Sequence, residues 1–164
     1  MCAKTLDRAA VISILLARRL SAEEAPLSLI PSSNLIVRQV PGKGRCVFAL
    51  RDIPKGALVL ADPIILVPGD QSDHTDETVV GRYVFQWNDE DDLAVVLGLG
   101  SLINHGLLEN VALVSNYAEM TMEFYATRDI KAGDELVYDY GHDNEELTEY
   151  YGIPKDALAS VALD

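Results

Sequence analysis

The chain has 164 residues, of which 49% are hydrophobic and 24% charged, so it is long enough for one domain with a buried core and too apolar to be disordered. Its formal net charge of -13 is spread unevenly: residues 1–42 hold five Lys or Arg and three Asp or Glu, a balance of +2 that leaves -15 for the rest. Such a surface argues against direct nucleic-acid binding and for a basic protein or peptide as partner, although an acidic balance can also serve solubility alone.

The N-terminal segment is predicted to form one helix followed by a connector. Over residues 7–20, apolar side chains recur at helical spacing on one face, and Arg18 and Arg19 fall on another. The apolar run is too short to span a bilayer, and no small-residue cleavage pattern follows it. We therefore expect a packing helix or a homodimer contact rather than a membrane anchor. Two prolines then interrupt residues 21–33, which predicts a connector.

From residue 34 onward, short apolar runs alternate with Gly, Pro and Asp, a rhythm typical of short strands joined by tight turns. Residues 69–78 are polar without periodicity and predict an exposed loop. The acidic run at residues 88–92 predicts a solvated hairpin tip rather than a metal site, because it lacks the ligand spacing of a calcium loop. Strands are expected at residues 35–37, 46–50, 57–60, 63–67, 83–87, 111–116, 120–126 and 136–140, with a short helix near residues 145–150.

Two turns have similar sequences. Residues 51–56 and residues 129–134 each follow a strand that contains an aromatic residue, and each combines Asp-Ile with a Lys and a Gly. The similarity is too short to indicate a repeat architecture. It predicts two similar strand-turn-strand corners.

The two cysteines, Cys2 and Cys46, lie in unrelated contexts and form no Cys-x-x-Cys or Cys/His spacing. A zinc site or a disulfide framework is therefore not expected. Free thiols fit a reduced compartment, so we expect a cytoplasmic protein, or a nuclear one in a eukaryotic host.

Two polar clusters stand in apolar, strand-like surroundings. Asn104 and His105 open the first, and Tyr138 and Tyr140 lie in the second. Buried Asn, His and Tyr side chains need hydrogen-bond partners, so we expect these residues to form a network or to contact a ligand. Taken singly, an Asn-His pair is commonly a capping pair, alternate tyrosines are commonly strand aromatics, and glycines such as those at residues 42–44 commonly serve a tight turn.

Three segments, in this order, resemble the motifs of the SET-domain protein lysine methyltransferases. Residues 42–49 are similar to the opening Gly-x-Gly motif of the family, residues 101–105 together with Asn110 to its central Asn-His motif, and residues 133–141 to its terminal motif. The order and spacing of all three carry the resemblance, which extends over residues 34–142.

The resemblance implies a mostly β fold, the β-clip SET fold of small twisted sheets, with pseudoknot-like threading of the C-terminal strand past the Asn-His segment. That threading would bring Asn104 and Tyr140 together. On this basis residues 34–142 form the SET domain, residues 1–33 a helical extension and connector, and residues 143–164 a C-terminal segment with a short helix.

The activity that the resemblance implies is methyl transfer from S-adenosylmethionine to a lysine of a basic protein or peptide. Tyr140 would be the catalytic tyrosine, Tyr138 would limit the product to mono- or dimethyl-lysine, and Tyr83 would lie near the substrate amine. Trp87 fits either the core or a channel wall. No metal is implied. The cofactor would be bound by Gly42, Lys43, Gly44, Arg45, Asn104, His105 and Tyr140.

The chain departs from the family pattern in two places. Gly106-Leu107 and Glu109 stand where Ser-Cys and Pro are common in the family, and no cysteine cluster follows Tyr140 to form a zinc-bound post-SET module. Residues 144–152 would have to close the substrate channel instead. The small size suggests a stand-alone prokaryotic or viral member. Two alternatives are a catalytically silent SET-like module that binds basic peptides and an oligomerising structural protein.

Overall fold

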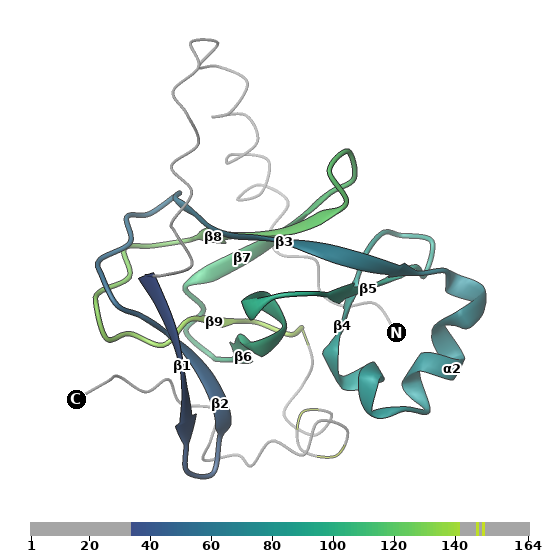
Figure 1. Ribbon diagram of the computed structural model, residues 1–164, viewed down its shortest axis with the longest axis horizontal. Coiled ribbons are helices and arrows are strands. Elements are labelled where there is room, and N and C mark those ends of the chain that lie inside the picture. Colours follow the sequence, from purple (N-terminus) through teal and green to yellow (C-terminus); the bar gives the residue numbers. More distant parts are fainter. Residues whose placement is uncertain (1–33, 142–146, 148, 150–164) are drawn as a thin grey trace.

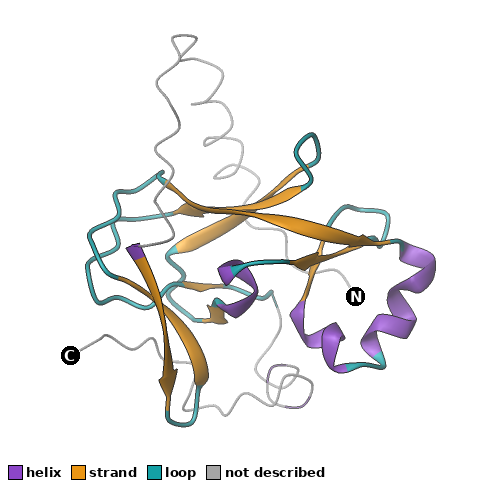
Figure 2. Ribbon diagram, viewed as in Figure 1, coloured by secondary structure: helices purple, strands orange, loops and turns teal. Residues whose placement is uncertain are grey.

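The computed structural model describes residues 34–141, 147 and 149 (Figure 1). These residues form three small sheets with a few short helical turns, which confirms the predicted mostly β fold (Figure 2). The predicted N-terminal helix and connector lie outside the described residues. Of the predicted C-terminal helix, only Leu147 and Glu149 are described; both are helical, and Leu147 is buried.

Antiparallel pairing builds two of the three sheets. One joins β1 (Leu35–Val40) to β2 (Gly44–Ala49), and the other has the strand order β4-β5-β3-β8-β7. A parallel pair, β6 (Asn104–His105) with β9 (Val137–Tyr138), forms the third sheet. The strands of the five-stranded sheet are β3 (Leu58–Val67), β4 (Val84–Gln86), β5 (Leu93–Val96), β7 (Val111–Asn116) and β8 (Thr121–Ala126).

Strand β3 corrects one prediction, because the two short strands expected around Pro63 form a single strand of ten residues. Its first half pairs with β8 as far as Pro63 opposite Thr121, and its second half pairs with β5 from Ile64 opposite Val96. Proline has no N–H to donate to a ladder. It is tolerated here because the strand changes partners at this residue.

The loop expected at residues 69–78 is also wrong in part, since the chain there forms short helices. These are η2 (Gly69–Gln71) and α2 (Ser72–Asp76), and η3 (Val79–Tyr83) follows directly after the segment. No residue of α2 is buried, which explains why the segment shows no apolar periodicity. Local hydrogen bonds hold the turns instead: the Ser72 hydroxyl donates to the Gly69 carbonyl, and the Thr78 hydroxyl accepts the Val80 N–H.

The acidic run at residues 88–92 is the tip of the hairpin between β4 and β5, as predicted. The Asn88 side chain organises this tip by accepting the N–H groups of Glu90 and Asp92. Among the described residues, no group of His, Cys, Asp and Glu side chains has an arrangement that could hold a metal ion. Nor does any described helix have the length and apolar character needed to cross a membrane.

The two turns of similar sequence pair with each other. Ile53 and Ile130 exchange backbone hydrogen bonds of 2.8 and 2.9 Å, and both side chains are buried. The aspartates act reciprocally, because Asp129 accepts the N–H of Lys55 at 2.9 Å while Asp52 accepts that of Ala132 at 3.0 Å. The two predicted turns thus pair with each other, and their hydrogen bonds hold the end of β8 beside the start of β3.

Candidate functional site

The parallel pairing of two very short strands brings the polar clusters together. Strand β6 (Asn104–His105) lies beside β9 (Val137–Tyr138), with Asn104 opposite Val137 and His105 opposite Tyr138. Gly106 continues the pairing by donating its N–H to the Tyr138 carbonyl at 3.1 Å. A Cβ on Gly106 would lie 2.7 Å from the Val137 side chain, so the close approach needs glycine.

Asn110 fastens this pair of strands from one side. Its side-chain amide donates to the Glu135 carbonyl at 2.8 Å and accepts the Val137 N–H at 2.9 Å. Its own N–H donates to the Val137 carbonyl at 3.0 Å. The side chain is buried, and it supplies partners to backbone groups that the two-residue ladder cannot satisfy. Asn110 therefore sets the path of the chain into β9.

Tyr140 is held at both its backbone and its phenol. Its N–H donates to His105 Nδ1 at 3.1 Å, and its hydroxyl donates to the Ile103 carbonyl at 3.0 Å. His105 Nδ1 also lies 3.7 Å from the Asp139 carboxylate. A nitrogen that accepts the Tyr140 N–H carries no proton, so this short distance is not an ion pair. His105 is 4% exposed, and its ring holds Tyr140 in place.

Aromatic rings extend the site away from Tyr140. The ring centroids of Tyr138 and Tyr140 are 4.6 Å apart, and Phe85 of β4 stacks on Tyr138 at 5.8 Å with an interplanar angle of 26°. The sequence left two positions for Trp87, in the core or in a channel wall. Its side chain is 5% exposed and packs edge-on against Tyr117. It belongs to the core.

A buried carboxylate joins the opening motif to the other two. Glu135 accepts a 2.6 Å hydrogen bond from the Lys43 ammonium and a longer one, 3.4 Å, from the Asn104 amide. The side chains of Lys43 and Glu135 are 6% and 0% exposed. The Asn104 amide also donates to the Arg45 carbonyl at 2.9 Å and to the Cys46 sulfur at 3.2 Å. Charge neutralisation makes this burial tolerable.

The same network controls the Cys46 thiol. Burial raises its pKa to about 12, and the nearby Glu135 carboxylate acts in the same direction. The thiol therefore remains protonated at physiological pH and unreactive.

The glycines of the opening motif lie at the turn between β1 and β2. Gly42 and Gly44 have φ values of 76° and 87°, a backbone conformation that favours glycine. A Cβ on either glycine would meet no atom of the described residues within 4 Å. Within the part of the chain that the structure describes, the space beside these two glycines is therefore open. Tyr83 joins the site through Arg45, whose guanidinium donates to the Tyr83 hydroxyl at 3.3 Å.

Residues 106–109, which depart from the family pattern, expose their two leucine side chains to solvent. Leu107 and Leu108 are 68% and 75% exposed, and the Leu108 carbonyl accepts a hydrogen bond from Arg128. Glu109 is half-buried, and burial together with the Asp139 charge raises the pKa of its carboxyl. The exposed leucines thus point away from the network around Asn104.

Sequence reasoning missed three contributors to the site. These are the buried Glu135 carboxylate, the Ile103 carbonyl that accepts the Tyr140 hydroxyl, and the Phe85 ring on Tyr138. Glu135 did carry a signal, because it is a charged residue directly before the apolar pair Leu136-Val137. A backbone carbonyl leaves no trace in a sequence, and the stacking of Phe85 depends on tertiary packing.

Comparison with known proteins agrees with this geometry. The SET domain family profile matches residues 44–141. The H3 lysine-37 specific histone-lysine N-methyltransferase of Schizosaccharomyces pombe is 33% identical over 110 residues, which cover 66% of this chain and 74% of that protein. The histone-lysine N-methyltransferase EZH2 of Chaetomium thermophilum is 30% identical over 125 residues, 68% of this chain but only 8% of that protein.

Solved structures show the same fold. The apo ctPRC2 structure with substitutions in Ezh2 gives a TM-score of 0.56 at 26% identity, covering 65% of this chain and 15% of that one. A candidate histone methyltransferase from Plasmodium falciparum gives 0.52 at 22% identity, covering 68% and 96%. Fold, motifs and relatives together define a SET-domain protein, and the chain belongs to this family. The predicted enzyme class, protein-lysine methyltransferase, is confirmed by the family and by the Schizosaccharomyces pombe relative.

Proposed function

We propose that this protein transfers methyl groups from S-adenosylmethionine to a lysine side chain of a basic protein and stops at mono- or dimethyl-lysine. The observation that carries the proposal is the pairing of β6 with β9, which places the fixed Asn104 amide beside the strand that leads to Tyr140. S-adenosylmethionine is the methyl donor of SET methyltransferases as a family.

The residues present fit this cofactor. The Asn104 amide nitrogen donates within the protein, so its amide oxygen is the atom that would accept from a donor such as the cofactor's ammonium group. The open space in front of Gly42 and Gly44 leaves room for a ligand against the backbone. When bound, the cofactor's sulfonium supplies an electrophilic methyl group. Lys43 would act indirectly, because Glu135 already neutralises its ammonium.

Tyr140 would align the reacting groups. Because its phenol proton is directed at the Ile103 carbonyl, the oxygen lone pairs face away from that bond, where they can accept from the lysine amine or contact the methyl group. Holding both reactants in line supplies much of the rate in such a displacement. The phenol is half-buried and is fixed before substrate arrives.

The aromatic rings would favour the neutral amine that the reaction needs. An unperturbed lysine has a pKa of about 10.4, and desolvation between aromatic rings lowers it. Tyr138 and Tyr140, with Phe85 stacked on Tyr138, would offer an aromatic surface beside which the amine loses water. Arg45, which donates to the Tyr83 hydroxyl, adds a positive charge that further disfavours the ammonium. The net charge of -13 attracts a basic substrate over longer distances.

Binding and turnover test the proposal in turn. Calorimetry should show S-adenosylmethionine binding to the wild-type protein; no binding would remove the enzymatic function and leave the silent basic-peptide module. With labelled cofactor and a basic substrate such as histones, Tyr140→Phe should lower kcat by on the order of a hundredfold, the usual cost of one lost transition-state contact. Tyr117→Phe is the matched control, since the Tyr117 hydroxyl also donates to a backbone carbonyl, that of Trp87, at 3.1 Å.

Replacing Tyr138 with phenylalanine tests the limit on methylation. The ring at position 138 would keep its stacking on Phe85 and its tilted contact with Tyr140, while the loss of the hydroxyl frees room beside the amine. We expect mass spectrometry to show a higher methylation state in the product of Tyr138→Phe. Identical products from the variant and the wild-type protein would contradict this role.

A further inference from the structure

A carboxylate outside all three motifs holds the turn that precedes Asn104. Asp62, in the middle of β3, accepts the Gly100 N–H at 2.8 Å through its Oδ2 atom. Gly100 belongs to η4 (Leu99–Leu102), the small coil that leads into β6 at the centre of Figure 2. The cap residue Gly98 offers no side chain to hold this helical turn, so Asp62 supplies an anchor from the neighbouring strand.

The fit between Asp62 and the turn leaves no room for side chains. A Cβ on Gly98 would lie 2.2 Å from the Asp62 Cγ atom, although the Gly98 backbone is extended and accepts any residue. A Cβ on Gly100 would lie 2.3 Å from the Phe124 ring and 3.0 Å from the Asp62 carboxylate. The turn is thus clamped between Asp62 and Phe124, and glycine is needed there because of contact.

Three hydrogen bonds connect Asp62 to the phenol of Tyr140. Asp62 accepts the Gly100 N–H, the Gly100 carbonyl accepts the Ile103 N–H at 3.2 Å, and the Ile103 carbonyl accepts the Tyr140 hydroxyl. Only one residue separates Gly100 from Leu102, the end of the turn, and Asn104 follows Ile103 directly. A shift of the turn therefore moves both the acceptor of Tyr140 and the Asn104 amide.

We infer that Asp62 is a positioning residue that sets the Ile103 carbonyl and Asn104 for methyl transfer, an inference that rests on the proposed function. In this role Asp62 acts through the Gly100 N–H and the Ile103 carbonyl rather than through a contact of its own with the reacting groups. Asp62 is half-buried, and this partial desolvation is unfavourable for a carboxylate, since it raises the pKa of Asp62 above its usual value. A role confined to stability would be served more cheaply by an apolar residue.

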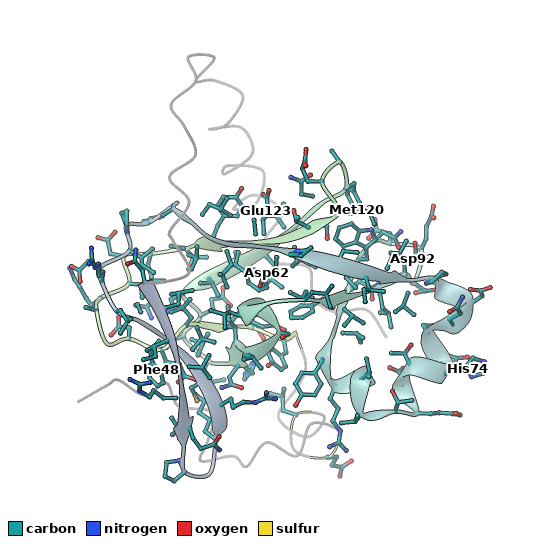
Figure 3. All side chains as sticks on the ribbon, in the orientation of Figure 1. Phe48, Asp62, His74, Asp92, Met120 and Glu123 are labelled. Atoms are coloured by element: carbon teal, nitrogen blue, oxygen red, sulfur yellow. The ribbon has the colours of Figure 1, made fainter. Side chains whose placement is uncertain are left out.

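Asp62→Ala, Asp62→Asn and Asp92→Ala form the test set. Asp92 is the matched control because its carboxylate also accepts a glycine N–H, that of Gly69, at 2.8 Å. Figure 3 labels both aspartates, with Asp62 near the middle of β3 and Asp92 toward α2. Steady-state kinetics with a histone substrate would be measured together with amide hydrogen exchange over residues 98–105 in the absence of cofactor.

We expect Asp62→Ala to lower kcat by about tenfold to a hundredfold, the cost of a small misplacement of the reacting groups. KM for the histone substrate should change little. Exchange over residues 98–105 should become faster. Asp62→Asn keeps an acceptor oxygen and should restore most of kcat and most of the protection from exchange. Asp92→Ala should leave kcat and the exchange rate unchanged. If Asp62→Ala does not fold, Gly98→Ala displaces the carboxylate without removing it. That variant should show the same fall in kcat and the same faster exchange over residues 98–105.

Wild-type kcat and wild-type exchange in Asp62→Ala or Gly98→Ala would overturn the inference. So would equal loss of kcat in Asp62→Ala and Asp92→Ala, because that result indicates a general effect of stability. Failure of the wild-type protein to bind S-adenosylmethionine would instead overturn the proposed function. The exchange measurement needs no cofactor and still tests the anchor in that case.

Discussion

Replacing Asn110 with alanine tests how the chain holds its two functional segments together. The substitution removes the partner of the Glu135 carbonyl and the partner of the Val137 N–H, both at buried positions. Each buried backbone group left without a partner costs about 1–3 kcal/mol, so the free energy of unfolding should fall by about 2–6 kcal/mol. Because a domain is stable by only about 5–15 kcal/mol, this is a large share.

Urea denaturation followed by the fluorescence of Trp87, the single tryptophan, measures this loss. Gln86→Ala is the control, because Gln86 is exposed and its amide also donates to a backbone carbonyl, that of Asn88. That substitution should change stability by no more than about 0.5 kcal/mol. A loss in Asn110→Ala as small as in Gln86→Ala would refute the reasoning, since it would mean that water or a shifted backbone replaces both bonds.

Two further predictions concern ionisable groups. In a Cys2→Ser background, Cys46 should resist iodoacetamide in the native protein, because a pKa of about 12 leaves only about one thiolate in ten thousand at pH 8. Glu135→Gln removes the negative charge beside the thiol and should speed labelling. Equal labelling rates in the two proteins would contradict the proposed charge effect. A hydrogen bond from Lys131, aided by a backbone N–H, lowers the pKa of Asp52. The pair therefore stabilises the folded protein at pH values above the usual Asp pKa of about 3.9. This stabilisation is lost as the pH falls through the lowered pKa of Asp52. Lys131→Met should therefore destabilise slightly near neutral pH and not in strong acid, as denaturation across that range would show; a difference that persists in acid would contradict it.

The sequence by itself determined the class of fold and the parts of the site. Short apolar runs between Gly, Pro and Asp predicted a β protein because strands and tight turns have local signatures. The strands β7 and β8 were found for the same reason. The three motifs pointed to Asn104, His105 and Tyr140 as candidate site residues because the resemblance to the family lies in particular side chains in a particular order.

Tertiary structure decided how these parts are connected. The joining of two predicted strands at Pro63 depends on a change of pairing partner. The helix α2 has no buried residue, and the turn before it depends on a local hydrogen bond from Ser72. The anchor at Asp62, the Ile103 carbonyl and the ion pair of Lys43 with Glu135 join residues 37 to 92 positions apart. Periodicity and propensity describe neighbours along the chain, so contacts over such separations appear only once the chain has folded.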